Sequence, residues 1–355
     1  MRRITIEEDS VLEVTASDVD RCLSFASELC AVPSPSGFTA AAEELVASRL
    51  RDAGLAPVRT RKHSIVAQIG GSGAPLVLAA HIDTLGAMVR SIKANGRLRL
   101  TKIGGYPDIY LVGENCTVHT RNGKSVSGTI QPVNPAAHVN GKLKDYRPTE
   151  EELEIVLDAP VRNPADVRAL GIENGDIVSL DPRTRVTETG YIKSRHLDDK
   201  AGAAILLALG GLASGGAELR RKVYLLFTTY EEVGHGGSAG IPDDAEEMIS
   251  VDMGAVGDDL AADEHVVSIC AKDSGGPYDY EVTGNLVETA KKHDIPHAID
   301  IYPLYGSDVE ASLRAGYDLA HGLIGPGVSA SHGYERAHRD GIGATLTLLA
   351  AYISQ

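Results

Sequence analysis

The sequence of 355 residues contains 34 Lys and Arg against 49 Asp and Glu, a net charge of −15, and is 43% hydrophobic. This length and hydrophobic content predict one large packed domain with room for a smaller second one. The negative charge argues against nucleic acids and anionic membrane surfaces as partners.

The N-terminus is charged within its first ten residues and lacks the apolar core of a signal peptide, and no stretch is long and apolar enough to span a bilayer. The cysteines show no CxxC spacing, so we expect reduced, mostly buried thiols instead of a thiolate zinc site or a disulfide framework. They are Cys22, Cys30, Cys116 and Cys270. These features predict a cytoplasmic protein.

Two amphipathic helices are predicted first along the chain. One covers residues 17–31, with Ser17 or Asp18 as its N-cap, and the other covers residues 39–53, with Gly54 as its C-cap. A cluster of Pro, Ser and Gly separates them.

The continuous apolar run at residues 76–80 predicts a strand that is buried on both faces. It delivers His81 and Asp83 to its C-terminal end. In open α/β sheets, ligands bind at that end of the strands.

From residue 89 to 187 the pattern changes to short alternating strands with hardly any helical periodicity. The pairs Asn95-Gly96 and Asn122-Gly123 are typical of type I′ hairpin turns. We therefore predict an inserted β-barrel-like (PDZ-like) domain at 89–187, which interrupts a discontinuous main domain of residues 1–88 and 188–355.

After the insertion, helices and strands alternate again. The sequence predicts a small-residue helix after Asp199, strands at 223–228 and 248–251, and helices at 285–293 and 341–353. The predicted fold class is α/β, with a mixed, mainly parallel central sheet flanked by helices.

Acidic and imidazole side chains follow several of these elements. Singly, an HxD pair is usually a surface feature, a Glu-Glu pair a solvated loop, and an Asp-Asp pair a helix N-terminus. Their joint placement at strand ends instead predicts a pair of divalent ions, because adjacent buried carboxylates need positive charge beside them. Two such ions could activate a water and polarise a carbonyl. The candidate residues are His81, Asp83, Asp198, Asp199, Glu231, Glu232, Asp252 and His332.

Six motifs in order resemble the glutamyl-aminopeptidase or tetrahedral (TET) family of dinuclear-metal aminopeptidases, and the match covers nearly the whole chain. The motifs are AHIDTLGAMV, SRHLDDKAGAAILL, FTTYEEVGHGGS, ISVDMG, YGSDVEA and SASHGYERAH.

The resemblance implies a ligand set and a general base. His81 and Asp252 would bind one metal, Glu232 and His332 the other, and Asp198 would bridge them. Choosing Asp198 over Asp199 as the bridge rests on the family motif alone. The resemblance also implies a cis peptide bond at Asp198-Asp199.

The catalytic roles fall to two further acids. Glu231 would be the general base, taking a proton from the bridging water and returning it to the leaving amine. Asp83 would accept a hydrogen bond from the His81 imidazole and fix its tautomer.

Departures from the family pattern lie near the substrate pocket. After the Glu-Glu-Val-Gly motif many members have a bulky residue and Arg, whereas this chain has His235-Gly236-Gly237. After the HxD motif many members have an acidic residue, whereas this chain has Thr84. His235 is a candidate substrate contact, with a structural histidine as the alternative. Ser307 and Asp308 stand where the family has Thr-Asp near the substrate's amino end, with a simple Asx turn as the alternative.

The predicted activity is removal of an N-terminal residue from a short peptide. The cofactors would be two divalent ions per subunit, with Zn²⁺ preferred and Co²⁺ or Mn²⁺ as alternatives. Similarity to a subgroup associated with an N-acetylglutaminylglutamine amide osmolyte points to a blocked dipeptide as the alternative substrate. A non-catalytic binding or scaffold protein is the remote alternative. The family also implies a homo-oligomer, built from dimers up to a dodecamer, with the insertion as contact surface.

Overall fold

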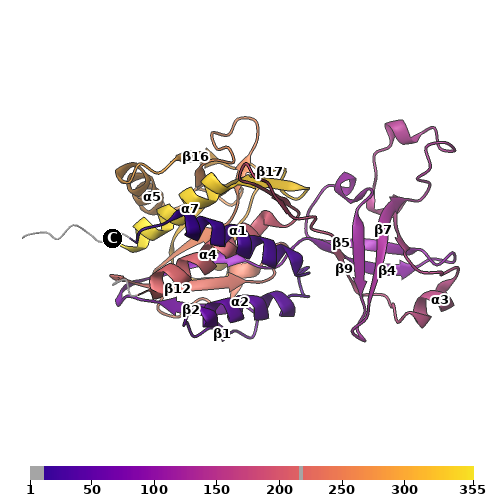
Figure 1. Ribbon diagram of the computed structural model, residues 1–355, viewed down its shortest axis with the longest axis horizontal. Coiled ribbons are helices and arrows are strands. Elements are labelled where there is room, and N and C mark those ends of the chain that lie inside the picture. Colours follow the sequence, from indigo (N-terminus) through magenta and orange to yellow (C-terminus); the bar gives the residue numbers. More distant parts are fainter. Residues whose placement is uncertain (1–11, 216–218) are drawn as a thin grey trace, which may run out of the picture.

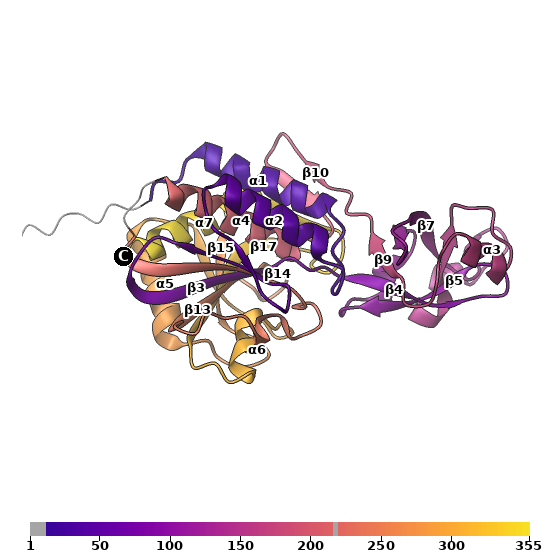
Figure 2. The same cartoon turned by 90° about the horizontal axis from the view of Figure 1, so that it is seen from below.

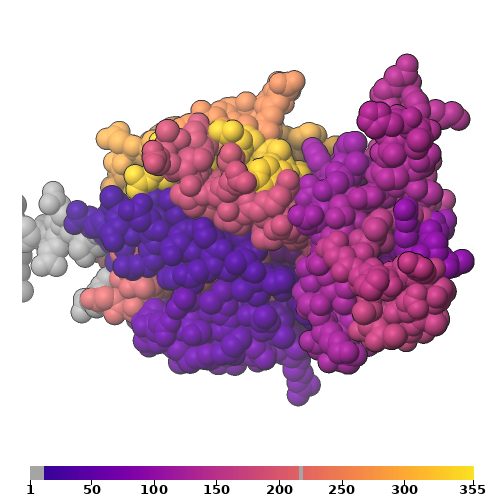
Figure 3. Space-filling model, turned by 45° about the vertical axis from the view of Figure 1, so that its right-hand side comes forward, coloured from indigo at the N-terminus to yellow at the C-terminus, as the bar shows by residue number. Residues whose placement is uncertain are grey.

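The computed structural model describes residues 12–215 and 219–355. The chain forms an α/β part and a β-barrel, and Figure 1 shows the barrel as a lobe at one end of the molecule. In the space-filling view of Figure 3 the barrel lies directly against the α/β part. Among the described residues, no helix has the length and apolar character needed to cross a bilayer.

A mixed sheet of 12 strands runs through the α/β part, in the order β1-β2-β12-β3-β13-β17-β18-β11-β10, with β14 and β15 paired to β17 and β16 paired to β15. The four central strands β12, β3, β13 and β17 are parallel to one another. Their bounds, and those of the other strands of this sheet, are β1 Val58–Arg59, β2 Ile65–Ile69, β3 Gly73–His81, β10 Arg185–Val186, β11 Tyr191–Ser194, β12 Arg221–Thr228, β13 Glu247–Val251, β14 Gly254–Val256, β15 Val267–Lys272, β16 His297–Ile301, β17 Ala320–Ser329 and β18 Glu335–His338.

Helices cover both faces of this sheet. Figure 2 shows α1, α2, α4 and α7 on one side and α6 on the other. The helices are α1 Ala16–Ala31, α2 Ala40–Asp52, α4 Leu197–Ser214, α5 Tyr280–Lys292, α6 Asp308–Arg314 and α7 Arg339–Ile353.

Strand β3 confirms the prediction of a strand that is buried on both faces. Leu76, Leu78 and Ala80 pack into the core beneath α1, α2, α4 and α7, whereas Val77 and Ala79 pack into the core beneath α6. Successive side chains of a strand point to opposite faces, so a continuous apolar run supplies both cores at once.

The barrel is closed, with strand order β4-β5-β8-β7-β6-β9, and all its pairings are antiparallel. The predicted fold class is therefore confirmed. The chain enters the barrel directly after β3 and rejoins the main sheet at β10. The barrel elements are β4 Gly86–Ile92, β5 Leu98–Ile103, β6 Asn115–His119, β7 Ser125–Pro132, β8 Leu153–Leu157, β9 Ile177–Leu180 and the short helix α3 Pro164–Ala169.

The two predicted hairpins form, but their turns are not type I′. A type I′ turn needs positive φ at both central residues, and here only the glycine of each pair has it, with φ 81° at Gly96 and 82° at Gly123. Each glycine N–H instead donates to the carbonyl three residues earlier, on Lys93 or Thr120. These are longer hairpin loops that place only the glycine in the left-handed region.

Two helix starts also differ from prediction. The N-cap of α1 is Thr15, whose N–H and hydroxyl both donate to Asp18. Helix α5 begins at Tyr280, not at residue 285, because the Asp279 side chain accepts hydrogen bonds from two N–H groups of the first turn. All four cysteines are free and buried, as predicted.

Helix α4 approaches β13 more closely than any side chain would allow. A Cβ at Gly202 would lie 2.0 Å from the carbonyl oxygen of Val251, the last residue of β13. The absence of a side chain therefore lets the start of α4 contact the end of β13 through backbone atoms. The predicted bridging ligand, Asp198, lies four residues before Gly202 in the first turn of the same helix.

Gly202→Ala should lower the free energy of unfolding by about 1–3 kcal/mol, because the methyl group must push α4 away from β13. The matched control is Gly211→Ala in the same helix, where a Cβ would meet nothing closer than an Arg21 nitrogen at 3.6 Å. That control should be neutral or more stable by up to about 1 kcal/mol, since Ala favours helix over Gly. The urea unfolding midpoints of the two variants measure both effects. Equal midpoints for Gly202→Ala and Gly211→Ala would contradict the close approach of α4 to β13.

Candidate active site

The predicted ligands converge on one cleft at the C-terminal ends of the parallel strands. His81 ends β3, Glu231 and Glu232 follow β12, and Asp252 follows β13. The cleft has a volume of about 730 Å³. It is lined by Gly105, Pro107, Tyr110, Asp198, Glu231, Glu232, Gly234, Asp252, Met253, Ala255, Ser274, Leu304, Tyr305, Gly306, Ser331 and His332. The first three come from the β4–β9 segment, so the barrel side of the molecule forms part of the cleft wall.

Asp198 lies at the centre of the cluster, between two imidazoles. Its Oδ1 is 3.1 Å from His81 Nε2, and its Oδ2 is 3.3 Å from His332 Nε2. Ligand atoms of His81, Asp198 and Asp252 all lie within 4.8 Å of one another. A carboxylate whose two oxygens face different imidazoles has the arrangement expected of a ligand shared by two ions.

Each of the two adjacent glutamates lies near a different imidazole. Glu231 Oε2 is 3.7 Å from His81 Nε2, and Glu232 Oε2 is 3.8 Å from His332 Nε2. Glu232 Oε1 also accepts a hydrogen bond from the Leu85 N–H, at 3.1 Å. The structure therefore brings all five predicted ligands and Glu231 together.

Asp199 occupies a different position from Asp198, although the two are adjacent. The peptide bond between them is cis, as the resemblance implied. Asp199 is fully buried, and its carboxylate accepts from the N–H groups of His81, at 3.2 Å, and of Gly202, at 3.0 Å. Asp199 thus holds the backbone of β3 and α4 together, while Asp198 faces the cleft.

The charges of the cluster depend on one another. Burial opposes ionisation of Asp198, yet hydrogen bonds from His332 and His81 outweigh it and hold the pKa of that carboxyl below its usual range. Burial likewise opposes charge on the imidazoles, but the bond to Asp198 raises the pKa of both, that of His332 to about 10.

Three further carboxyls of the cluster resist ionisation. Burial raises the pKa of Glu231 and Glu232 well above their usual range, and burial with the charge of Asp198 raises that of Asp252 to about 7. Divalent cations would relieve this crowding of negative charge. The donor set of imidazole nitrogens and carboxylate oxygens fits Zn²⁺, Co²⁺ or Mn²⁺.

Asp83 holds the site in a way that differs from the prediction. The Nδ1 atom of His81 lies 3.0 Å from the backbone carbonyl of Asp83, and the Asp83 carboxylate is 3.7 Å away. That carboxylate instead accepts from the Ser36 hydroxyl at 2.5 Å and from the Glu231 N–H at 3.2 Å. The carbonyl therefore fixes the tautomer that leaves His81 Nε2 free, and the side chain positions the Glu231 loop.

Sequence reasoning gave no role to Glu335, which organises the opposite side of the cluster. Its buried carboxylate accepts hydrogen bonds from the N–H groups of Asp198, at 3.2 Å, and of His332, at 2.9 Å. It thus fixes the backbones of two predicted ligands together. Its position three residues after His332 in a tight loop is the one signal that could have suggested this role.

Lys200 was also missed. It is completely buried, and its ammonium donates to the Ser34 hydroxyl at 2.6 Å and to the Ile82 carbonyl at 2.7 Å. Burial lowers the pKa of Lys200 to about 8. The side chain ties the first turn of α4 to the residue between His81 and Asp83.

The three predicted substrate contacts lie outside the cleft, because none is among the described residues that line it. Ser307 is buried, with its hydroxyl 2.8 Å from that of Tyr278. Asp308 is buried beneath the Glu231 loop, where it accepts a hydrogen bond from Thr228. His235 stacks on Tyr230, with ring centroids 5.0 Å apart. The Ser307 hydroxyl thus has an internal partner, whereas the second carboxylate oxygen of Asp308, Oδ1, is buried without a hydrogen-bond partner among the described residues.

Gly236 explains the packing of Asp308. A Cβ at Gly236 would lie 1.9 Å from Asp308 Oδ1. The departure from the family pattern at this position therefore lets the Glu231–Glu232 loop rest directly on the start of α6.

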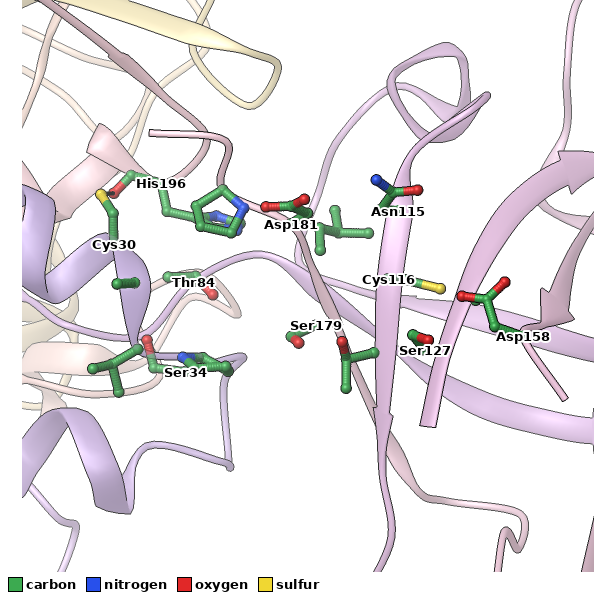
Figure 4. Close-up of a pocket in the computed structure, with 17 residues that line it drawn as sticks. Cys30, Ser34, Thr84, Asn115, Cys116, Ser127, Asp158, Ser179, Asp181 and His196 are labelled. Carbon is green, nitrogen blue, oxygen red and sulfur yellow. Dashed lines mark hydrogen bonds between the residues drawn. The ribbon is translucent and has the colours of Figure 1, made fainter. Parts of the chain in front are cut away.

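A second cavity of about 400 Å³ lies between the α/β part and the barrel. Figure 4 shows Cys30, Ser34 and His196 on one side of it and Cys116, Ser127 and Ser179 on the other. Burial lowers the pKa of His196 to about 3, as expected of a structural histidine. None of the predicted catalytic or metal-binding side chains lines this cavity, so the chemistry belongs to the larger cleft.

Comparison with known proteins places the chain in a family. The family model described as M42 glutamyl aminopeptidase matches residues 63–348. A putative aminopeptidase of Bacillus subtilis, YhfE, is 42% identical over 340 residues, which are 95% of this chain and 98% of the relative.

Solved structures share the fold. The aminopeptidase APDkam598 from the archaeon Desulfurococcus kamchatkensis is 23% identical, covers 95% of both chains and superimposes with a TM-score of 0.83. The TET1 peptidase of Pyrococcus horikoshii, which can assemble into a tetrahedron or a large octahedral shell, is 21% identical with a TM-score of 0.83, covering 94% of this chain and 99% of that one.

Glu335→Gln should weaken metal binding by about 10–100-fold, the usual effect of losing a group that orients ligands. A glutamine keeps the shape but can accept only one of the two N–H bonds, and its amide would face the other N–H. The control is Arg336→Gln, because Arg336 is the next residue of β18 but pairs with Glu264 instead of the predicted ligands. Metal content measured against buffered free Zn²⁺ tests this, and an unchanged affinity in Glu335→Gln would refute the positioning role.

Proposed function

The chain belongs to the M42 glutamyl aminopeptidase family and is a metal-dependent aminopeptidase, and on this premise we propose a two-ion site that releases the N-terminal residue of short peptides. The observation that carries the proposal is the carboxylate of Asp198, with one oxygen 3.1 Å from His81 and the other 3.3 Å from His332.

We assign His81 and Asp252 to one ion, Glu232 and His332 to the other, and Asp198 to both. The assignment is supported by their convergence and by the hydrogen bonds that hold the backbones of His81, Asp198 and His332. When bound, such ions polarise the substrate carbonyl and lower the pKa of a water molecule. Zn²⁺ is our preferred ion, and Co²⁺ and Mn²⁺ suit the same donors.

Glu231 is the proton carrier in this proposal. It lines the cleft beside the ligands, and its N–H is held by the Asp83 carboxylate at 3.2 Å. With Glu232 directed toward His332, the neighbouring Glu231 is left to take a proton from the attacking water and return it to the leaving amine.

The cleft wall favours substrates with an uncharged side chain. Beyond the acids of the cluster, it presents Pro107, Tyr110, Met253, Leu304 and Tyr305, and none of its described lining residues is Lys or Arg. An acidic side chain would find no partner there, and an apolar one would pack against these groups.

A blocked dipeptide is the second candidate substrate, and one observation favours it. Asp308, expected near the amino end of a substrate, is buried behind the cleft, so the described lining offers a free ammonium group no acid outside the cluster. A non-catalytic scaffold is disfavoured because every predicted ligand and the base are present.

We also propose a cytoplasmic homo-oligomer, built from dimers up to a dodecamer. Its support is the likeness to the Pyrococcus horikoshii peptidase that assembles into closed shells, together with four free, buried cysteines. The insertion predicted at residues 89–187 would provide contact surface and control access to the cleft.

A substrate screen tests the activity. Protein reconstituted with Zn²⁺, Co²⁺ or Mn²⁺ is assayed with amino-acid p-nitroanilides and with N-acetylated dipeptide amides. We expect leucyl and alanyl p-nitroanilides to be cleaved faster than glutamyl and lysyl ones, and chelation to abolish cleavage. Turnover of the blocked compounds alone would replace the first proposal with the second.

Glu231→Gln should keep both ions yet lower kcat by about 10²–10⁴-fold, because an amide cannot accept the proton. Glu232→Gln is the matched comparison, since it should lose metal as well as activity. Metal content and steady-state kinetics, measured on both variants, distinguish loss of the base from loss of a ligand. Near-normal turnover by Glu231→Gln would show that another group is the base.

A further inference from the structure

A second group of metal-binding side chains lies outside the active-site cleft. His265 precedes β15, His338 ends β18, and Asp340 lies in the first turn of α7. Their ligand atoms lie within 4.8 Å of one another. None of the three lines the active-site cleft.

The carboxylate of Asp340 faces both imidazoles. Its Oδ2 is 3.1 Å from His265 Nδ1 and 3.2 Å from His338 Nδ1. Ligand atoms in a tetrahedral site with bonds of about 2.0–2.1 Å are separated by about 3.3 Å, so two of the three edges already have the spacing of a zinc site.

The hydrogen bonds of His338 define which of its nitrogens carries hydrogen. Nε2 lies 2.8 Å from the carbonyl of Thr189, which can only accept, so Nε2 donates. Nδ1 accepts the N–H of Asp340 at 3.1 Å. The unprotonated Nδ1 of His338 therefore points toward the cluster, and an imidazole that donates its other N–H to a carbonyl is the usual metal-ligand arrangement.

His265 can take the same form. Its Nε2 is 3.3 Å from the Tyr191 hydroxyl, which can accept that N–H and leave Nδ1 free to face Asp340. The lone pair of His265 Nδ1 and the Asp340 carboxylate would then face each other, which is unfavourable unless a cation lies between them. Tyr191 packs edge-on against both rings and holds them in place.

Exposure of the cluster leaves room for an ion and a water. The His265 side chain is 42% exposed and that of Asp340 is 59% exposed, whereas His338 is 9% exposed. One fixed ligand and two adjustable ones can close around an ion, and solvent can supply the fourth position.

We propose that His265, His338 and Asp340 form a second site for a divalent transition-metal ion, with Zn²⁺ as the best fit. The ion ties the segment before β15 to the start of α7, two regions 75 residues apart in sequence. Its contribution is to stability, because none of the three residues lines the active-site cleft. A bound ion displaces the Asp340 N–H from His338 Nδ1, so the affinity is lower than that of the active site.

The test compares the wild-type protein with His265→Ala/Asp340→Ala. Each is equilibrated with Zn²⁺, freed of unbound metal by gel filtration and analysed for zinc per subunit. The double variant should hold one zinc fewer and keep the wild-type kcat. The control is His293→Ala: His293 lines the same cavity as His265 and Asp340 but does not belong to the three-residue group, so this variant should hold as much zinc as wild type.

Two further readouts keep the proposal testable. Zn²⁺ should raise the Tm of an Asp198→Asn chain, and the same chain with His265→Gln should lose that rise. Equal zinc content in wild type and double variant overturns the proposal and leaves a protonated His265–Asp340 ion pair as the explanation. If the double variant misfolds by circular dichroism, His265→Gln alone replaces it in the zinc measurement.

Discussion

The burial of several carboxylates around His81 is the constraint on which the rest of the structure depends. Asp198, Asp199 and Asp252 are almost inaccessible to solvent, and Glu231 and Glu232 line the same cleft. Such a cluster is tolerated only where positive charge and N–H donors surround it. The strand ends supply the acids, and the imidazoles and backbone amides supply part of the compensation.

Backbone amides are held by carboxylates throughout this site. Asp83 binds the N–H of Glu231, Asp199 binds that of His81, and Glu335 binds those of Asp198 and His332. Each of these acids is buried and accepts hydrogen bonds from backbone N–H groups, so it acts on the position of its neighbours. The acidic residues thus serve two purposes. Some face the cleft, and others fix the positions of the cleft residues.

Close backbone packing completes this arrangement. Gly202 lets α4 touch the end of β13, and Gly236 lets the Glu231–Glu232 loop rest on Asp308. Both contacts bring together segments that carry cluster residues. The His265–His338–Asp340 group, by contrast, joins surface elements with fewer constraints, which suits a role in stability and not in turnover.

The sequence by itself determined the fold class, the strand that ends at His81 and the residue types of the cluster, because apolar runs and their polar ends are local features. It also singled out the five predicted ligands and Glu231, through motifs that resemble those of a known family. Only the tertiary structure decided that the carbonyl of Asp83 and not its carboxylate orients His81, that Glu335 and Lys200 support the cluster, and that Ser307 and Asp308 lie behind the cleft. These outcomes depend on distances between segments far apart in the chain, and no spacing within one segment encodes which donor will reach which acceptor.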